Sequence, residues 1–246
     1  MIDRAPVYWY DELDSTSEEA KRRARAGELG PLWIAARQQS AGRGRLGRTW
    51  VSPIGNLFST ILFPEPEGLA MAGRVPFAAA LAVRDTCSLA VPGLPAQLKW
   101  PNDVRIAGQK LSGILTETGE TNNLLWVALG IGINIEHAPD IPGIAATSLR
   151  AEGAPAAMVA EHFLQDLRAG LGRRLEQMRR DFSGLLVDWL KHAEGHGQLV
   201  TAGPLDNRIE GVFEGLAEDG GMILRLPDGA QRIIRAGDVE LVKRVS

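Results

Sequence analysis

The sequence predicts an α+β fold in which a large domain of mixed strands and helices precedes a small β domain. Segments with helical spacing of apolar residues and short strand-like runs follow one another irregularly up to residue 192. After Gly197 only short strand-like runs remain, and glycine-containing turns separate them. We therefore place the domain boundary between residues 196 and 197, which gives a domain of 1–196 and a β domain of 197–246.

The first half of the chain begins with a helix that its capping residues predict. Ser15-Thr16-Ser17-Glu18-Glu19 contains two overlapping capping boxes, and Gly27 suits the position after the last helical turn. The later segments of this half are predicted as a strand at 32–37, a loop at 40–53, a strand at 56–63 and a buried, alanine-rich helix at 73–89.

The second half is predicted to add more strands to the sheet and then two helices. The predicted segments are short strands at 97–100 and 104–106, hairpin strands at 111–118 and 123–135 joined at 119–122, and amphipathic helices at 155–178 and 182–192.

Composition excludes several classes of protein. A formal net charge of -3 argues against a surface built for nucleic acid. Cys87 is the only cysteine, so an internal disulfide and a thiolate metal cluster are both excluded, and its alanine-rich surroundings suggest a core residue. No stretch approaches the ~20 apolar residues that span a bilayer, and the first residues do not resemble a signal peptide. We therefore expect a cytoplasmic protein.

The segment 41–48 (AGRGRLGR) is the most informative in the chain. Its three glycines let the backbone approach a ligand, and its three guanidinium groups repel one another unless an anion holds them together. It also fits the dinucleotide fingerprint G-x-G-x-x-G and resembles a phosphate loop, but both motifs must open a helix, and residues 50–55 (WVSPIG) are a poor helix start. Taken alone, the segment also fits a flexible, solvated basic loop.

Residues 39–50 (QSAGRGRLGRTW) resemble the signature loop of biotin–protein ligases. Further matches follow in the family's order and spacing at 99–103 (KWPND), 110–117 (KLSGILTE), 130–134 (GIGIN) and 146–149 (ATSL). The resemblance implies a catalytic domain similar to class II aminoacyl-tRNA synthetases, with a mixed β-sheet flanked by helices, and a small SH3-like domain after it. The first motif begins at Asp14, which leaves no room for the N-terminal DNA-binding domain of the regulatory members, so we expect no DNA binding.

The resemblance also implies a reaction with two steps. Biotin would react with ATP to give biotinyl-AMP, and a lysine of a carrier protein would then displace AMP. The expected carrier is the biotin carboxyl carrier protein of acetyl-CoA carboxylase or a similar carboxylase. Mg²⁺ is expected with ATP, and exposed sheet edges suggest a homodimer.

Site residues are carried over position by position. The catalytic residues would be Arg43, Lys110 and Asp103, where Asp103 would bind Mg²⁺ or orient the attacking lysine. The biotin-binding residues would be Ser15, Thr16, Ser17, Gln39, Arg43, Gly44, Arg45, Lys110 and Gly113, and Ser17 stands where some members have asparagine. The ATP-binding residues would be Arg45, Arg48, Trp50, Lys99, Asn102 and Asn134.

Structural interpretations compete with several of these roles. Ser15 and Thr16 would cap a helix, Trp50 would be a core tryptophan, and Asn102 would form a turn after Pro101. Gly113 and its neighbours in 130–134 would mark β-bulges. As alternatives for the whole protein, a lipoate or octanoate ligase or transferase shares the fold, and a nucleotide- or DNA-binding module and a nicotinamide dehydrogenase are further candidates.

Overall fold

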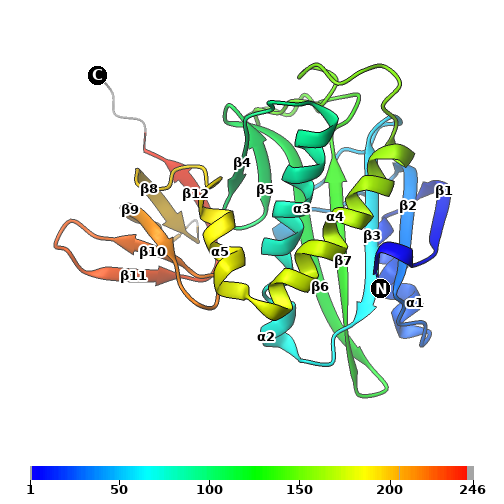
Figure 1. Cartoon of the computed structure of the whole chain (residues 1–246), viewed down its shortest axis with the longest axis horizontal. Helices are drawn as coiled ribbons and strands as arrows, with labels where there is room; N and C mark the ends of the chain where they lie inside the picture. The colour runs from blue at the N-terminus through cyan, green and yellow to red at the C-terminus, as the bar shows by residue number, and fades with distance from the viewer. Residues whose placement is uncertain (1, 205, 243–246) are drawn as a thin grey trace.

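The structure is a computed structural model that describes residues 2–204 and 206–242. A seven-stranded sheet with the order β1-β2-β3-β7-β6-β5-β4 forms its larger part (Figure 1). Its strands are β1 (Val7–Leu13), β2 (Leu32–Gln39), β3 (Leu57–Pro64), β4 (Ala96–Lys99), β5 (Asp103–Ile106), β6 (Gln109–Thr121) and β7 (Leu124–Ile133). Because β1 pairs with β2 in parallel and the other pairs are antiparallel, the sheet is mixed, as expected.

The two faces of this sheet differ in the size of their side chains. Along β7, Leu129 and Ile131 point into the main hydrophobic core, which α3 (Val75–Ala90) and α4 (Ala160–Arg180) cover. Gly130 alternates with them and faces α1 (Thr16–Arg25), where a Cβ atom would come within 2.8 Å of Ser17 Oγ. The strand therefore supplies bulk to the core on one face and leaves space on the other.

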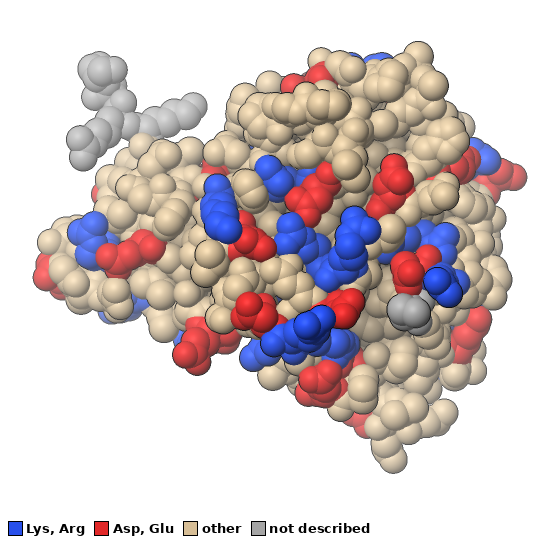
Figure 2. All heavy atoms as spheres, viewed as in Figure 1, with Lys and Arg blue, Asp and Glu red and all other residues tan. Residues whose placement is uncertain are grey.

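The face of the molecule that α3 and α4 cover carries charges of both signs. Figure 2 shows basic and acidic side chains next to one another across this face, with no large basic patch. Arg174, for example, lies 2.7 Å from Asp85 and 3.2 Å from Asp188. The pairing agrees with the mildly acidic composition.

A second, antiparallel sheet follows α5 (Phe182–Leu190), with the order β11-β10-β9-β8-β12. Its strands are β8 (Leu199–Gly203), β9 (Ile209–Leu216), β10 (Met222–Arg225), β11 (Gln231–Ile234) and β12 (Asp238–Leu241). Phe213 and Met222 of this sheet belong to the main hydrophobic core, and Trp100 Nε1 donates to Gly220 O at 3.1 Å. The α+β class with a C-terminal β unit is thus confirmed, whereas the domain boundary at 196/197 stays a prediction; residues 243–246 of that predicted domain lie outside the described part.

Three local features differ from the prediction. Strand β1 was not expected, because it lies at the sheet edge and its side chains are half-buried or exposed on both faces. Ser15 occupies the N-cap position of α1, but its side chain makes no capping hydrogen bond. The β6–β7 hairpin turns at Asn122-Asn123, both with positive φ, whereas Gly119 lies within β6.

Two predictions from composition can be compared with the structure: Cys87 as a core residue and the lack of a membrane-spanning segment. Cys87 is completely buried in α3, and burial raises the pKa of its thiol, which confirms it as a core residue. Within residues 2–204 and 206–242, no helix combines the length and the apolar character needed to cross a membrane.

The contact between α3 and the C-terminal sheet gives a test of stability. Gly220 has a φ of +83°, and a Cβ atom there would lie 2.4 Å from the Phe77 ring of α3. Gly229 has nearly the same φ, +85°, but its Cβ would meet no atom within 4 Å. Gly229→Ala should cost about 1 kcal/mol of unfolding free energy from backbone strain. Gly220→Ala should cost the same backbone strain and, in addition, ~1–3 kcal/mol from overpacking against Phe77. Urea denaturation measures both unfolding free energies, and equal costs for the two variants would contradict the packed contact.

Candidate functional site

A cavity of about 430 Å³ opens on the α1 side of the large sheet. Six groups of residues provide most of its lining, and they come from distant parts of the chain. They are the start of α1 (15–17), the loop between β2 and β3 (43–51), the β4–β5 turn (99–103), the middle of β6 and β7, the segment after β7 (139–146), and β12 with its neighbours. All fifteen residues predicted for the site line this cavity; they are Ser15, Thr16, Ser17, Gln39, Arg43, Gly44, Arg45, Arg48, Trp50, Lys99, Asn102, Asp103, Lys110, Gly113 and Asn134.

One end of the cavity is polar and uncharged. Gln39 Oε1 accepts from the backbone nitrogen of Thr16 at 2.8 Å and lies 3.2 Å from Thr16 Oγ1. Gln39 Nε2 donates to Ser52 Oγ at 2.9 Å, and Thr60 Oγ1 donates to Thr16 Oγ1 at 2.9 Å. Because Ser15, Thr16 and Ser17 are all nearly inaccessible to solvent, these hydroxyls form a fixed, desolvated corner.

Trp50 lies flat against the sheet next to this corner. A Cβ atom on Gly132 would come within 2.6 Å of the Trp50 indole, and one on Gly113 within 2.8 Å. The β6–β7 register is regular through both glycines, so they are not β-bulges. Their function in the fold is to make room for the indole, which lies across two strands and forms a wall of the cavity.

The arginine-rich segment forms a small hairpin rather than an open loop. Arg43 and Thr49 make an isolated antiparallel bridge, Trp50 N donates to Gly42 O at 2.9 Å, and Gly44 N donates to Arg48 O at 2.7 Å. Leu46 sits at the tip with a positive φ and is 74% exposed. The hairpin is therefore closed at its stem and meets solvent at its tip.

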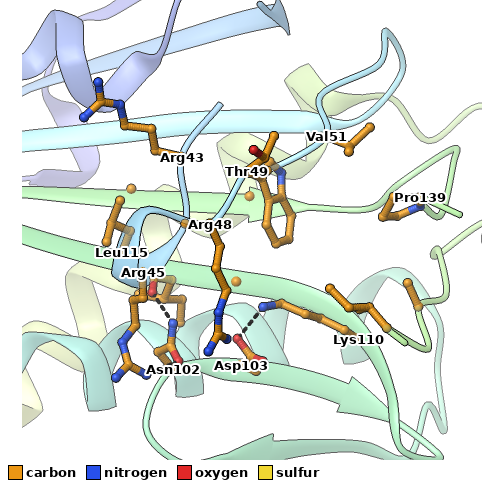
Figure 3. Close-up of a pocket in the computed structure, with 18 of the residues that line it drawn as sticks. Arg43, Arg45, Arg48, Thr49, Val51, Asn102, Asp103, Lys110, Leu115 and Pro139 are labelled. Carbon is orange, nitrogen blue, oxygen red and sulfur yellow. Dashed lines mark hydrogen bonds and ion pairs between the residues drawn. The ribbon is translucent and has the colours of Figure 1, made fainter. Parts of the chain in front are cut away.

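Two cations at the cavity are paired with acceptors of the β4–β5 turn (Figure 3). Lys110 Nζ lies 2.8 Å from Asp103 Oδ1, and Arg45 Nη1 donates to Asn102 Oδ1 at 2.8 Å. Arg45 also donates to the carbonyl of Gly237 at 3.3 Å.

The C-terminal sheet and helix α1 provide the carboxylates for the other arginines. Arg48 pairs with Asp238 of β12. Arg43 Nη1 lies 2.7 Å from Glu18 Oε1 of α1. These pairs hold the mutually repelling guanidinium groups of the hairpin in place.

The structure separates two residues that the sequence placed at one centre. Figure 3 shows Arg43 pointing away from Lys110, and 56% of its side chain is exposed because it reaches Glu18 on the helix. Arg45 extends instead towards Asn102 and Asp103. Arg45 therefore contacts the β4–β5 turn, whereas Arg43 contacts α1.

Burial changes the acid–base properties of the charged cavity. Burial lowers the pKa of Lys99, with a further contribution from Arg105, while nearby carboxylates raise it. Burial also lowers the pKa of Arg45. For Asp238, burial alone would raise the pKa, but the bond from Arg48 and the charges of Arg45 and Lys99 lower it overall. The cavity thus favours anions over uncompensated cations.

Two uncharged side chains that line the cavity each have a buried polar atom with no hydrogen-bond partner among the described residues. The atoms are Trp50 Nε1, a donor, and Asn134 Oδ1, an acceptor. The amide nitrogen of Asn134 is used, since it donates to Thr147 O at 3.0 Å. Because an unpaired buried polar atom is costly, both atoms fit contacts with a ligand.

Sequence reasoning missed residues that only the fold brings to the site. Thr60 and Ser52 complete the polar corner. Asp238 and Arg208 line the cavity from the C-terminal sheet, about 190 residues after the hairpin in the case of Asp238. No local sequence pattern marks any of these positions. Asp238 could have been found only by recognising that it pairs with the arginines of the hairpin.

Comparison with known proteins gives a consistent result. The family model described as "Biotin/lipoate A/B protein ligase family" matches residues 12–134, and "Biotin protein ligase C terminal domain" matches residues 195–242. The chain is 37% identical to the biotin–[acetyl-CoA-carboxylase] ligase of Paracoccus denitrificans over 92% of this chain and 96% of that protein. It is 31% identical to the ligase of the same name from Mycobacterium tuberculosis, covering 93% and 86%. The solved biotin protein ligase of Aquifex aeolicus, in complex with biotin and ATP, aligns with a TM-score of 0.78 at 27% identity and covers 97% of this chain and 99% of that one.

The packing of Trp50 against the sheet can be tested without a ligand. Gly132→Ala should push the indole off β7 and loosen the hairpin, so that trypsin cleaves after its arginines several times faster than in the unmodified protein. Gly215→Ala is the control, since its Cβ on β9 would meet no atom within 4 Å. If both variants were cleaved at the original rate, Trp50 would not anchor the hairpin.

Proposed function

Because the chain belongs to the biotin/lipoate A/B protein ligase family, we propose that its cavity activates biotin with ATP and passes the biotinyl group to a lysine of a carrier protein. One observation supports the proposal independently of family membership. A single cavity joins an uncharged polar corner, suited to the ureido ring of biotin, to a cluster of cations suited to a triphosphate.

The reaction requires two anions to approach each other. An oxygen of the biotin carboxylate attacks the α-phosphorus of ATP, the bond to the β-phosphate breaks, and pyrophosphate leaves. In the second step the lysine amine attacks the acyl carbon of biotinyl-AMP, the bond to AMP breaks, and the amine loses a proton. Fixed positive charge at the reacting phosphate lowers the barrier of the first step, because charge accumulates there in the transition state.

We assign that charge to Lys110 and Arg45. Lys110 stands next to the turn at Ala107-Gly108, and Asp103 holds its ammonium group in the cavity. Arg45 faces the same region through Asn102. When the phosphates bind, they replace part of the interactions that Asp103 and Asn102 now provide. Asp103 would then be free to accept a proton from the attacking lysine amine.

The adenine ring is assigned to the wall formed by Trp50 and Asn134. The unpaired acceptor Asn134 Oδ1 suits the exocyclic amine of adenine, and the indole offers a face for stacking. Lys99 and Arg48 line the charged end of the cavity, where the β- and γ-phosphates would lie.

The uncharged corner is assigned to biotin. Ser15, Thr16, Ser17 and Gln39 provide hydroxyl and amide groups that are buried and already positioned by mutual hydrogen bonds. Such preorganised groups match the donors and acceptors of a ureido ring at little ordering cost. Gly113 lines the cavity beside this corner, and the Trp50 indole that packs on it would border the bound biotin.

Magnesium fits this site as a companion of the nucleotide. The described residues contain no group of three or more potential ligands among His, Cys, Asp and Glu, so a dedicated metal centre is not built here. Asp103 offers one carboxylate in the cavity, and Mg²⁺ commonly needs only one or two beside phosphate oxygens and water. Asp103 would hold the ion in the first step, where the ion would neutralise phosphate charge, and would act on the lysine amine in the second step.

The carrier protein follows from the names of the relatives. We propose the biotin carboxyl carrier protein of acetyl-CoA carboxylase, because the Paracoccus denitrificans and Mycobacterium tuberculosis proteins are called ligases of that carboxylase. Activity in the cytoplasm, the absence of DNA binding, and a homodimer formed through the exposed edge strand β1 remain further predictions.

A panel of acids tests the substrate class. With purified protein, biotin should support ATP–pyrophosphate exchange, whereas lipoate and octanoate should support at least tenfold less, because their dithiolane and alkyl ends leave the hydroxyl corner unpaired. Calorimetry with each acid, with and without ATP, should give the same order. Preference for lipoate or octanoate would support the alternative ligase or transferase, and no exchange with any acid would contradict the proposal.

Substitution of Lys110 tests the reacting centre. Lys110→Ala should lower the rate of biotin-dependent exchange about 10²–10³-fold, since a cation at the transferred phosphate is lost and Asp103 becomes an unpaired anion. Lys191→Ala is the matched control, because Lys191 is 61% exposed and pairs only with Asp188 of the same helix region. An exchange rate for Lys110→Ala equal to that of the control would remove Lys110 from the centre.

A further inference from the structure

Glu18 lies on the side of α1 that faces the hairpin, and nothing in the assignment above uses it. Its Oε1 atom lies 2.7 Å from Arg43 Nη1 and 2.8 Å from Lys21 Nζ. Only 17% of the Glu18 side chain is exposed. The carboxylate is thus shared by a residue of its own helix and a residue of the hairpin stem.

The same contacts continue to the sheet. Lys21 Nζ also lies 2.7 Å from Glu117 Oε1 of β6, so the charges alternate from Arg43 through Glu18 and Lys21 to Glu117. Burial alone would raise the pKa of Glu18, but the bond and charge of Lys21 and the charges of Arg43 and Arg25 lower it overall. The row therefore joins the hairpin stem to α1 and β6 by fixed charges.

The hairpin is held at two places: at one its protein partners line the cavity, and at the other its partner lies on α1. Its tip side is held by Arg45 and Arg48, whose partners Asn102 and Asp238 line the cavity. Its stem is held by Arg43, whose guanidinium points away from Lys110 towards Glu18 (Figure 3). Phosphates that enter the cavity compete for the first pair of arginines and leave the Arg43–Glu18 contact in place.

We infer that Glu18 is a positioning residue that anchors the stem of the hairpin through Arg43 and thereby slows the escape of the acyl-adenylate. This inference rests on the proposed function. The tip can exchange its protein partners for phosphates only if the stem stays where Trp50 and the sheet hold it. Without the anchor, the whole hairpin moves, and the reactive intermediate dissociates before the carrier lysine arrives.

The test measures release of biotinyl-AMP formed on the enzyme, by chasing labelled intermediate with unlabelled biotin. Glu18→Gln and Arg43→Ala should each speed release about three- to tenfold, and the double variant should be no faster than the faster single variant. Arg43→Lys keeps a charge that can reach Glu18 and should release biotinyl-AMP more slowly than Arg43→Ala. Glu117→Gln is the matched control: it removes the Lys21–Glu117 pair, leaves the Arg43–Glu18 pair, and should not change release.

A second measurement separates this inference from the proposed function. Deuterium exchange of hairpin amides in the ligand-free protein should be faster in Glu18→Gln and Arg43→Ala and unchanged in Glu117→Gln. Original exchange and release rates in Glu18→Gln, or additive effects in the double variant, would overturn the anchor. If no acyl-adenylate forms in the unmodified protein, the proposed function fails, and the deuterium measurement still decides whether Glu18 anchors the hairpin.

Discussion

The constraint on which this structure depends is the mutual repulsion of the cations gathered at one cavity. Arg43, Arg45, Arg48 and Lys110 can lie near each other only because acceptors from separate elements hold them. Those acceptors belong to α1, the β4–β5 turn and β12. Because no single element supplies them all, the cavity exists only when the large sheet, its helix and the C-terminal sheet are assembled.

A second constraint is the absence of side chains on one face of two strands. Gly113 and Gly132 leave the surface on which the Trp50 indole lies, and Gly130 leaves room for Ser17. The opposite face of β7 carries Leu129 and Ile131 and belongs to the main core. One strand thus stabilises the fold with one face and shapes the site with the other, so the site is attached to the most rigid part of the molecule.

Most of the architecture could be predicted, because helices and central strands carry their own signals. The helix at α3 and the strands at β2 and β3 follow from apolar periodicity and burial. Strand β1 could not be predicted, since an edge strand with half-exposed side chains on both faces has no clear alternation. The turn at Asn122-Asn123 was misplaced because Gly119 is a stronger turn signal, although its real function is to accommodate Trp126.

The site was predictable to the extent that its chemistry lies in local motifs. The predicted residues meet in one cavity, but their sequence spacing does not fix the direction in which each side chain points. Arg43 and Arg45 are two positions apart, yet one turns to a helix and the other to the cavity, because their partners are distant in sequence. On the proposed function, the same reasoning gives the C-terminal sheet a part in the site: Asp238 balances Arg48 as a carboxylate that a phosphate would replace. A ligand that brings its own negative charge therefore exchanges one partner for another, and the hairpin does not have to acquire its cationic arrangement during binding.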